Sequence, residues 1–145
     1  MGIGKVRGSC GQATVELAVA LPVVIAVAVI AVNALLFFGE CAAFDRVSSQ
    51  AVRAYAASPA YGQDTQRSCA LVKAALDRQF SESYLDVSVS AGNAGSGKVR
   101  FTSTLTFHPT LFGLGLKSRV FGVELPSLRH SSALAVSVYK PGVLL

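Results

Sequence analysis

A run of 23 residues from Leu17 to Gly39 contains no charged side chain. As an α-helix the run would be about 35 Å long, which is enough to cross the roughly 30 Å hydrocarbon core of a bilayer. It is apolar on every side, and the remainder of a 145-residue chain is too small to wrap it completely. The sequence therefore predicts one membrane-spanning helix.

A secretory signal peptide is the obvious alternative, but its apolar core is usually about 7–15 residues long and ends at a small-residue cleavage site. Here the run continues smoothly into CAAFDRVSSQAVRAYAAS, residues 41–58, whose apolar side chains share one helical face. The first stop signal is Ser58-Pro59. We therefore expect one helix of more than about 40 residues, apolar in its first half and amphipathic in its second.

Charges beside the run predict its direction in the membrane. Lys5 and Arg7 precede the run, whereas Glu40 and Asp45 follow it closely. Short basic flanks stay on the cytoplasmic side. The N-terminus is therefore expected in the cytoplasm and residues 40–145 outside the cell membrane.

Composition argues against two other classes of protein. The chain carries 13 Lys and Arg against 8 Asp and Glu, a net charge of +5. These basic residues are scattered, and no aromatic-rich binding pattern accompanies them, so we expect no nucleic-acid partner. The charged fraction of 14% is well below the roughly 25% of soluble domains, which argues against an ordinary cytosolic protein.

An acidic residue, Glu16, directly precedes the apolar run within the segment KVRGSCGQATVE, residues 5–16. Cleavage after Gly11 would expose a free amine at Gln12, one helical turn from Glu16. The carboxylate would suit the positive end of the helix dipole and could pair with that amine, on its own chain or on a neighbour. A buried polar pair of this kind can set the register between packed helices. The alternative is that Glu16 simply lies among lipid headgroups.

The segment GQATVELAVALPVVIAV, preceded by a short basic leader, resembles the N-terminus of type IV prepilin-like proteins. More narrowly, it is similar to the TadE/TadF-like minor pilins, or pseudopilins, of tight-adherence (Flp) pilus systems. The matching features are Gly11 at the cleavage position, Glu16 as the fifth mature residue, and Leu21-Pro22 early in the helix. The extension ending QAVRAYAAS is also similar, so the resemblance covers residues 5–58.

This resemblance implies a structural and assembly subunit. A prepilin peptidase would remove residues 1–11, leaving Gln12 first, a transmembrane helix half at 12–39 and an extracytoplasmic domain at 40–145. Glu16 would serve subunit register or recruitment. The expected partners are other pilins or pseudopilins, the pilus assembly platform, the peptidase and membrane lipid. The alternative is an uncleaved single-span membrane protein whose outer domain binds an extracytoplasmic partner.

The outer residues predict a small α+β domain. RSCALVKAALDRQF, residues 67–80, has a helical apolar face and a candidate N-cap at Asp64 or Thr65. The pattern then alternates, which predicts a β-hairpin from residues 84–91 and 98–108 around the turn GNAGSG. Weaker alternation predicts a strand over 120–125, and a clear one predicts a strand over 132–139, stopped by Pro141. One apolar face of this antiparallel sheet should pack against both helices.

Two cysteines, Cys41 and Cys69, would remain outside the membrane after cleavage, where disulfides persist. We favour a Cys41–Cys69 bridge that ties the second helix to the first, the alternative being two free thiols. Within the apolar run, Pro22 removes a backbone donor and introduces a possible kink. Asn33, the one polar residue of the run, is expected to bond backbone or to lie near the outer face, with a helix–helix contact as the alternative.

No catalytic or metal-binding pattern emerges. His108 and His130 have no second ligand at metal spacing, and His108-Pro109 suits a turn. GNAGSGK lacks the full phosphate-loop spacing and joins two strands. We therefore expect a non-enzymatic protein without cofactor or metal. The apolar, glycine-rich segment 108–122 could cover a sheet edge or offer a surface to another pilin.

Overall fold

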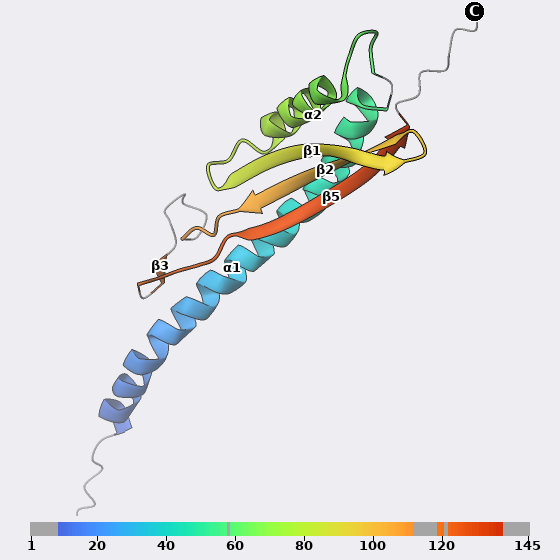
Figure 1. Cartoon of the computed structure of the whole chain (residues 1–145). Coiled ribbons are helices and arrows are strands. Elements are labelled where there is room, and N and C mark those ends of the chain that lie inside the picture. The colour runs from blue at the N-terminus through green and yellow to red at the C-terminus, as the bar shows by residue number, and fades with distance from the viewer. Residues whose placement is uncertain (1–8, 58, 112–118, 121, 138–145) are drawn as a thin grey trace, which may run out of the picture.

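The computed structural model describes residues 9–57, 59–111, 119–120 and 122–137. A long N-terminal helix, a second helix and a three-stranded antiparallel sheet make an α+β fold, which confirms the predicted class (Figure 1). The elements are α1 (Ser9–Tyr55), α2 (Thr65–Gln79), β1 (Leu85–Gly95), β2 (Lys98–Phe107), β3 (Arg119–Val120), β4 (Val123–Glu124) and β5 (Leu128–Ser137).

Helix α1 runs for 47 residues without interruption, although Pro22 lies inside it. Its N-terminal half projects as a stalk, and its C-terminal half lies against the sheet (Figure 1). The predicted continuous helix is therefore confirmed. It ends at Tyr55, three residues before the predicted stop at Ser58-Pro59. It is also the one helix in the described part of the chain that is long and apolar enough to cross a membrane.

Helix α2 begins where the sequence predicts. Asp64 is its N-cap, and the Asp64 Oδ1 atom accepts a hydrogen bond from the Arg67 backbone N–H at 2.7 Å. The two helices run antiparallel. At one end the Gln63 side chain donates to the Tyr55 carbonyl, and at the other end Phe80 packs edge-on against Phe44, with ring centroids 5.4 Å apart.

The main sheet has the order β1-β2-β5, with both neighbouring pairs antiparallel. The predicted hairpin is confirmed, but its turn is tighter than expected. β1 continues to Gly95, so only Ser96 and Gly97 form the loop. Both have positive φ, 51° and 70°, as a two-residue turn that matches strand twist requires. Gly92, Asn93 and Gly95 of the predicted turn pair with β2, and the register shift between Asn93 and Gly95 accommodates Ala94.

The core of the head lies between the sheet and the two helices. The alternating pattern is confirmed, since Leu85, Val87, Phe101, Leu105 and Phe107 are all buried on one sheet face. The helices contribute Phe44, Ala51 and Val52 from α1 and Val72 and Leu76 from α2, and Ala56 follows directly after α1. One apolar sheet face therefore packs on the amphipathic half of α1 and on α2, as expected.

The strand predicted over residues 120–125 is wrong. Val120 lies in the two-residue strand β3, and Val123 and Glu124 form the two-residue strand β4; these strands pair with each other, apart from the main sheet. Gly122 turns the chain between them with φ 83°, which divides the apolar run that suggested a single strand.

Strand β5 starts at Leu128 rather than at the predicted Ser132. Residues 128–131 are recruited because they pair with residues 104–107 of β2. The predicted strand end at Tyr139 and stop at Pro141 lie outside the described residues. So do 112–118 and 121 of the segment expected to cover a sheet edge.

Candidate functional site

The residues expected at the processing and assembly site lie together at the free end of α1. Gly11, Gln12 and Glu16 are all exposed, and a Cβ added at Gly11 would meet no neighbouring atom within 4 Å. The Gln12 side-chain amide donates to the Glu16 carboxylate at 3.0 Å. The structure therefore places Gln12 and Glu16 one turn apart on one helix face. Cleavage after Gly11 and pairing of Glu16 with an amine stay predictions.

Further along α1, Asn33 forms a polar contact that crosses 77 residues of sequence. Its side-chain amide nitrogen donates to the Thr110 carbonyl at 2.9 Å and to the Val29 carbonyl at 2.8 Å. The Thr110 backbone N–H donates back to the Asn33 side-chain oxygen at 2.9 Å. We call this arrangement the Asn33–Thr110 clasp. It confirms the expected bond from Asn33 to backbone.

The clasp is almost completely shielded, because Asn33 and Thr110 are each 4% exposed. It joins the apolar run of α1 to the chain that leaves β2, three residues after the last strand residue, Phe107. Sequence patterns missed Thr110 because nothing in HPTL marks its backbone as a partner. The available signal was Asn33 itself, since a lone amide in an apolar helix requires a hydrogen-bond partner.

Two partly exposed histidine–aspartate contacts lie near the same end of the head. The His130 Nε2 atom lies 2.8 Å from Asp45 Oδ1 and so connects β5 to α1. The His108 Nε2 atom lies 2.9 Å from Asp86 Oδ2, just beyond the paired strand ends. His108 directly follows the end of β2, as expected, but the structure has no turn at His108 or Pro109. In the part of the chain that the structure describes, no group of three potential ligands gathers to hold a metal ion.

The favoured Cys41–Cys69 disulfide is not formed, and both residues are free thiols. The antiparallel helix pairing explains the correction. Cys69 lies near the start of α2, which Gln63 ties to Tyr55 through its contacts with the Tyr55 carbonyl and the Ser68 hydroxyl. Cys41 precedes Tyr55 by 14 residues, about 21 Å along the helix axis, and Cys69 lies four residues into α2, which returns about 6 Å of that length. About 15 Å along the axis remains, whereas a disulfide requires Cα atoms within about 7 Å.

Both thiols are held mainly in the neutral form. Burial raises the pKa of Cys69, and burial together with the charges of Asp45 and Glu40 raises the pKa of Cys41. Reactive cysteines need the opposite, a lowered pKa beside positive charge. These two thiols are therefore poorly suited to nucleophilic chemistry.

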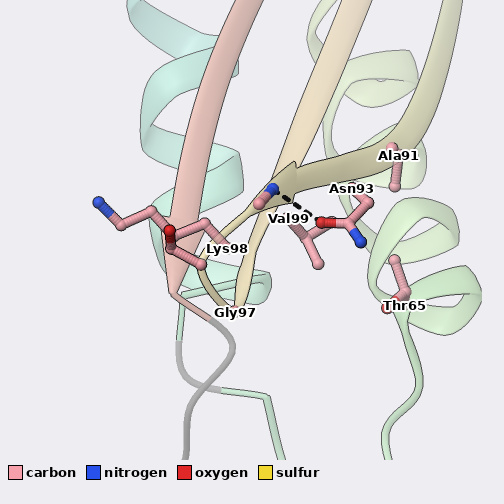
Figure 2. A pocket seen from close by; sticks show the side chains of 9 residues that line it. Thr65, Ala91, Asn93, Gly97, Lys98 and Val99 are labelled. Carbon is pink, nitrogen blue, oxygen red and sulfur yellow. Dashed lines mark hydrogen bonds between the residues drawn. The ribbon is translucent and has the colours of Figure 1, made fainter.

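A shallow hollow of about 410 Å³ lies where the β1–β2 turn approaches the start of α2. Figure 2 shows Asn93 and Thr65 beside it and Lys98 directed away from it. The Asn93 side-chain oxygen accepts a hydrogen bond from the Gly95 backbone N–H at 2.8 Å, which fixes the turn. The glycine-rich segment thus shapes a hairpin and does not form the strand-to-helix loop that cradles phosphate.

Comparison with known proteins adds no assignment, because no family model, curated protein or solved structure matches the chain significantly. The interpretation of this molecule therefore depends on its own residues and geometry. Its most distinctive arrangement is a projecting apolar helix that carries Gly11, Gln12 and Glu16 at its tip and is clasped to a folded head further along.

Proposed function

We propose that this protein is a minor pilin-like, or pseudopilin-like, subunit that takes part in assembling a tight-adherence type IV pilus. The observation that supports this most is the single unbroken helix α1, whose projecting apolar half ends in Gly11, Gln12 and Glu16. A basic leader with Lys5 and Arg7 precedes these residues. A structural role, without a catalytic step of its own, follows from this proposal.

In this proposal, a prepilin peptidase cuts the bond after Gly11 on the cytoplasmic side. The new α-amine of Gln12 carries a positive charge at neutral pH. The Glu16 carboxylate, one turn along, pairs with this amine on its own chain or on a neighbouring subunit. In an apolar bundle an unpaired carboxylate is costly, so this pairing aligns adjacent helices along the filament axis.

The head then lies outside the membrane, at the C-terminal end of the span. The packing of the head agrees with this arrangement, because α1 contributes Phe44, Ala51 and Val52 to the core of the head and leaves its N-terminal half exposed. Subunits whose helices are aligned along the filament axis would contact each other through the exposed apolar faces of α1. The head would meet other pilins or the assembly platform.

The decisive experiment is N-terminal sequencing of the protein after co-expression with a prepilin peptidase. We expect the chain to start at Gln12, with a matching shift in gel mobility. Gly11→Val should abolish processing, whereas Gly8→Val, a matched change in the leader, should leave the mature N-terminus at Gln12. Purified protein that still carries its first eleven residues in the presence of active peptidase would contradict the proposal.

The second candidate is an uncleaved single-span membrane protein whose head binds an extracytoplasmic partner. The Asn33–Thr110 clasp supports both candidates equally. It fixes the head to the apolar helix whether or not the leader is removed. Retention of the leader, together with normal membrane insertion and a folded head, would select this alternative.

A further inference from the structure

Strand β5 leaves one long edge of the main sheet without a backbone partner. It is the last strand in the order β1-β2-β5, and it pairs with β2 over all ten of its residues. Within the described part of the chain, the backbone of residues 128–136 forms no hydrogen bonds beyond that ladder. Alternate N–H and C=O groups along this stretch therefore point outward from the sheet, as they do on an edge strand.

Proteins normally block such an edge, and β5 lacks the usual devices. Short strands, prolines, lysines and β-bulges all discourage further pairing. The sequence of β5, LRHSSALAVS, contains neither proline nor lysine. Its pairing with β2 shows no register shift, whereas β1, at the opposite edge, is interrupted between Asn93 and Gly95. The outer edge of β5 is therefore a regular template to which another strand can be added.

The helices also cover the two edges unequally. Leu85 and Val87, on the core face of β1, are 7% and 9% exposed where α2 packs against that strand. Leu128 and His130 occupy the same two levels of β5 and are only half-buried, as is Leu134 further along. Apolar side chains of an added strand would cover Leu128 and Leu134. This side of the edge therefore favours a partner with apolar residues at alternate positions.

The solvent face of the same edge carries a positive charge. Arg129 is exposed, and in the described chain the ion pairs are formed by other residues. Side chains directly opposite each other on neighbouring strands interact, and opposite charges there are favourable. An added strand should therefore carry an acidic residue at the level of Arg129.

A second copy of this chain fits the edge poorly. Figure 1 shows β5 running in the same general direction as α1, and the contacts agree, because Asn33 lies by the start of β5 and Asp45 further along α1 bonds His130. Two β5 edges joined antiparallel, the more stable arrangement, would point the two projecting helices in opposite directions. Such a pair cannot anchor both helices in one membrane.

We propose that the outer edge of β5 accepts an extended segment of a different protein as a fourth, antiparallel strand. The segment alternates apolar and polar residues and places an acidic residue opposite Arg129. Main-chain hydrogen bonds supply the affinity, and the side chains fix the register. The choice of a different protein rests on the membrane anchoring within the proposed function. The edge itself does not depend on leader cleavage or pilus assembly.

The test uses a fluorescein-labelled peptide of eight residues that alternates Thr and Val, with Glu in the seventh position. Antiparallel pairing with residues 128–135 places Val beside Leu128 and Leu134 and Glu opposite Arg129. Two further peptides carry N-methyl groups on either the odd or the even residues. Fluorescence anisotropy measures binding to the full chain in uncharged detergent micelles, sedimentation measures self-association, and circular dichroism checks that each variant is folded.

We expect saturable binding, with one N-methyl pattern abolishing it and the other retaining it, because only alternate amides face the neighbouring strand. Arg129→Glu should weaken binding at least about threefold, whereas Arg100→Glu, the matched change on β2, should alter it less than about twofold. A peptide with Lys in place of Glu should prefer Arg129→Glu protein over the unaltered chain.

Absence of binding to the folded protein, or equal effects of the two N-methyl patterns, would overturn the proposal. Self-association that Arg129→Glu abolishes would also overturn it, because a second copy would then be the partner. None of these results bears on cleavage after Gly11, which N-terminal sequencing tests separately.

Discussion

The two halves of α1 belong to one uninterrupted helix and yet face different surroundings. In the N-terminal half, side chains such as Leu17, Val19 and Val23 are exposed by 61–70%. In the C-terminal half, Phe44 and Val52 are 0% and 1% exposed and lie buried in the head. The comparison shows that helix continuity comes from backbone bonding, whereas the position of each half is decided by which side chains find protein partners.

The largest expected effect concerns the tip of the exposed half. Glu16→Ala should leave membrane insertion intact but abolish piliation and co-purification with other pilins, because the partner of the Gln12 amine is lost. Glu40→Ala, at the other end of the uncharged run, is the matched control and should assemble normally. Pilus counts by electron microscopy and pull-downs measure both. Normal assembly by Glu16→Ala would reject the register role.

In the buried half, Phe44→Ala should lower the free energy of unfolding of the head by about 3–5 kcal/mol, since it empties the contact among α1, α2 and β5. Phe38→Ala removes the same ring from an exposed position and should change it by less than about 0.5 kcal/mol. Thermal unfolding in detergent micelles, followed by circular dichroism, measures the difference. An equal loss of unfolding free energy in both variants would show that Phe44 contributes no more to the stability of the head than the exposed Phe38 does.

At the junction of the halves, Asn33→Ala should cost about 1–3 kcal/mol, because it leaves the Thr110 N–H and C=O buried without partners. Hydrogen exchange at the Thr110 amide should accelerate about tenfold or more. Leu35→Ala, two residues away on the exposed face, should leave that exchange unchanged. An unaltered Thr110 amide in Asn33→Ala would mean that the clasp does not hold the loop.

The smallest expected effect concerns the raised pKa values of the Cys41 and Cys69 thiols. Because a raised pKa lowers the thiolate fraction at any given pH, Cys41 and Cys69 should both react with maleimide more slowly than free cysteine at pH 8, and faster as the pH rises. Asp45→Asn removes one charge that raises the pKa of Cys41 and should speed its alkylation by less than about tenfold. The pKa of Cys69 is raised by burial alone, so Asp45→Asn should leave the alkylation rate of Cys69 unchanged. Mass spectrometry of Cys10→Ser protein measures both sites.

Most of the fold could be predicted from local sequence patterns. The length of α1, the Asp64 cap and the alternation in β1 and β2 each depend on neighbouring residues, and each was predictable. Only the Asn33 half of the clasp was predictable. A lone amide in an apolar helix requires a hydrogen-bond partner, whereas Thr110 takes part through its backbone groups, which every residue type except proline carries. The split into β3 and β4 depends on the turn at Gly122, which the apolar pattern around it concealed.

The cysteines illustrate a different limit. Their compartment could be argued from sequence, but their separation depends on the direction in which α2 returns along α1. Either direction satisfies the apolar faces of both helices, so periodicity does not decide it. The Gln63 contacts with Tyr55 and Ser68 reveal the direction only once the chain is folded.

The way α1 is attached has a mechanical consequence. Its contacts with the head extend from Asn33 through Phe44 to Val52, along a large part of the helix rather than at one point. A pull along the helix axis would load these contacts together in shear, whereas a sideways pull on the stalk would load the Asn33–Thr110 clasp first. The molecule should therefore resist axial tension far better than lateral peeling.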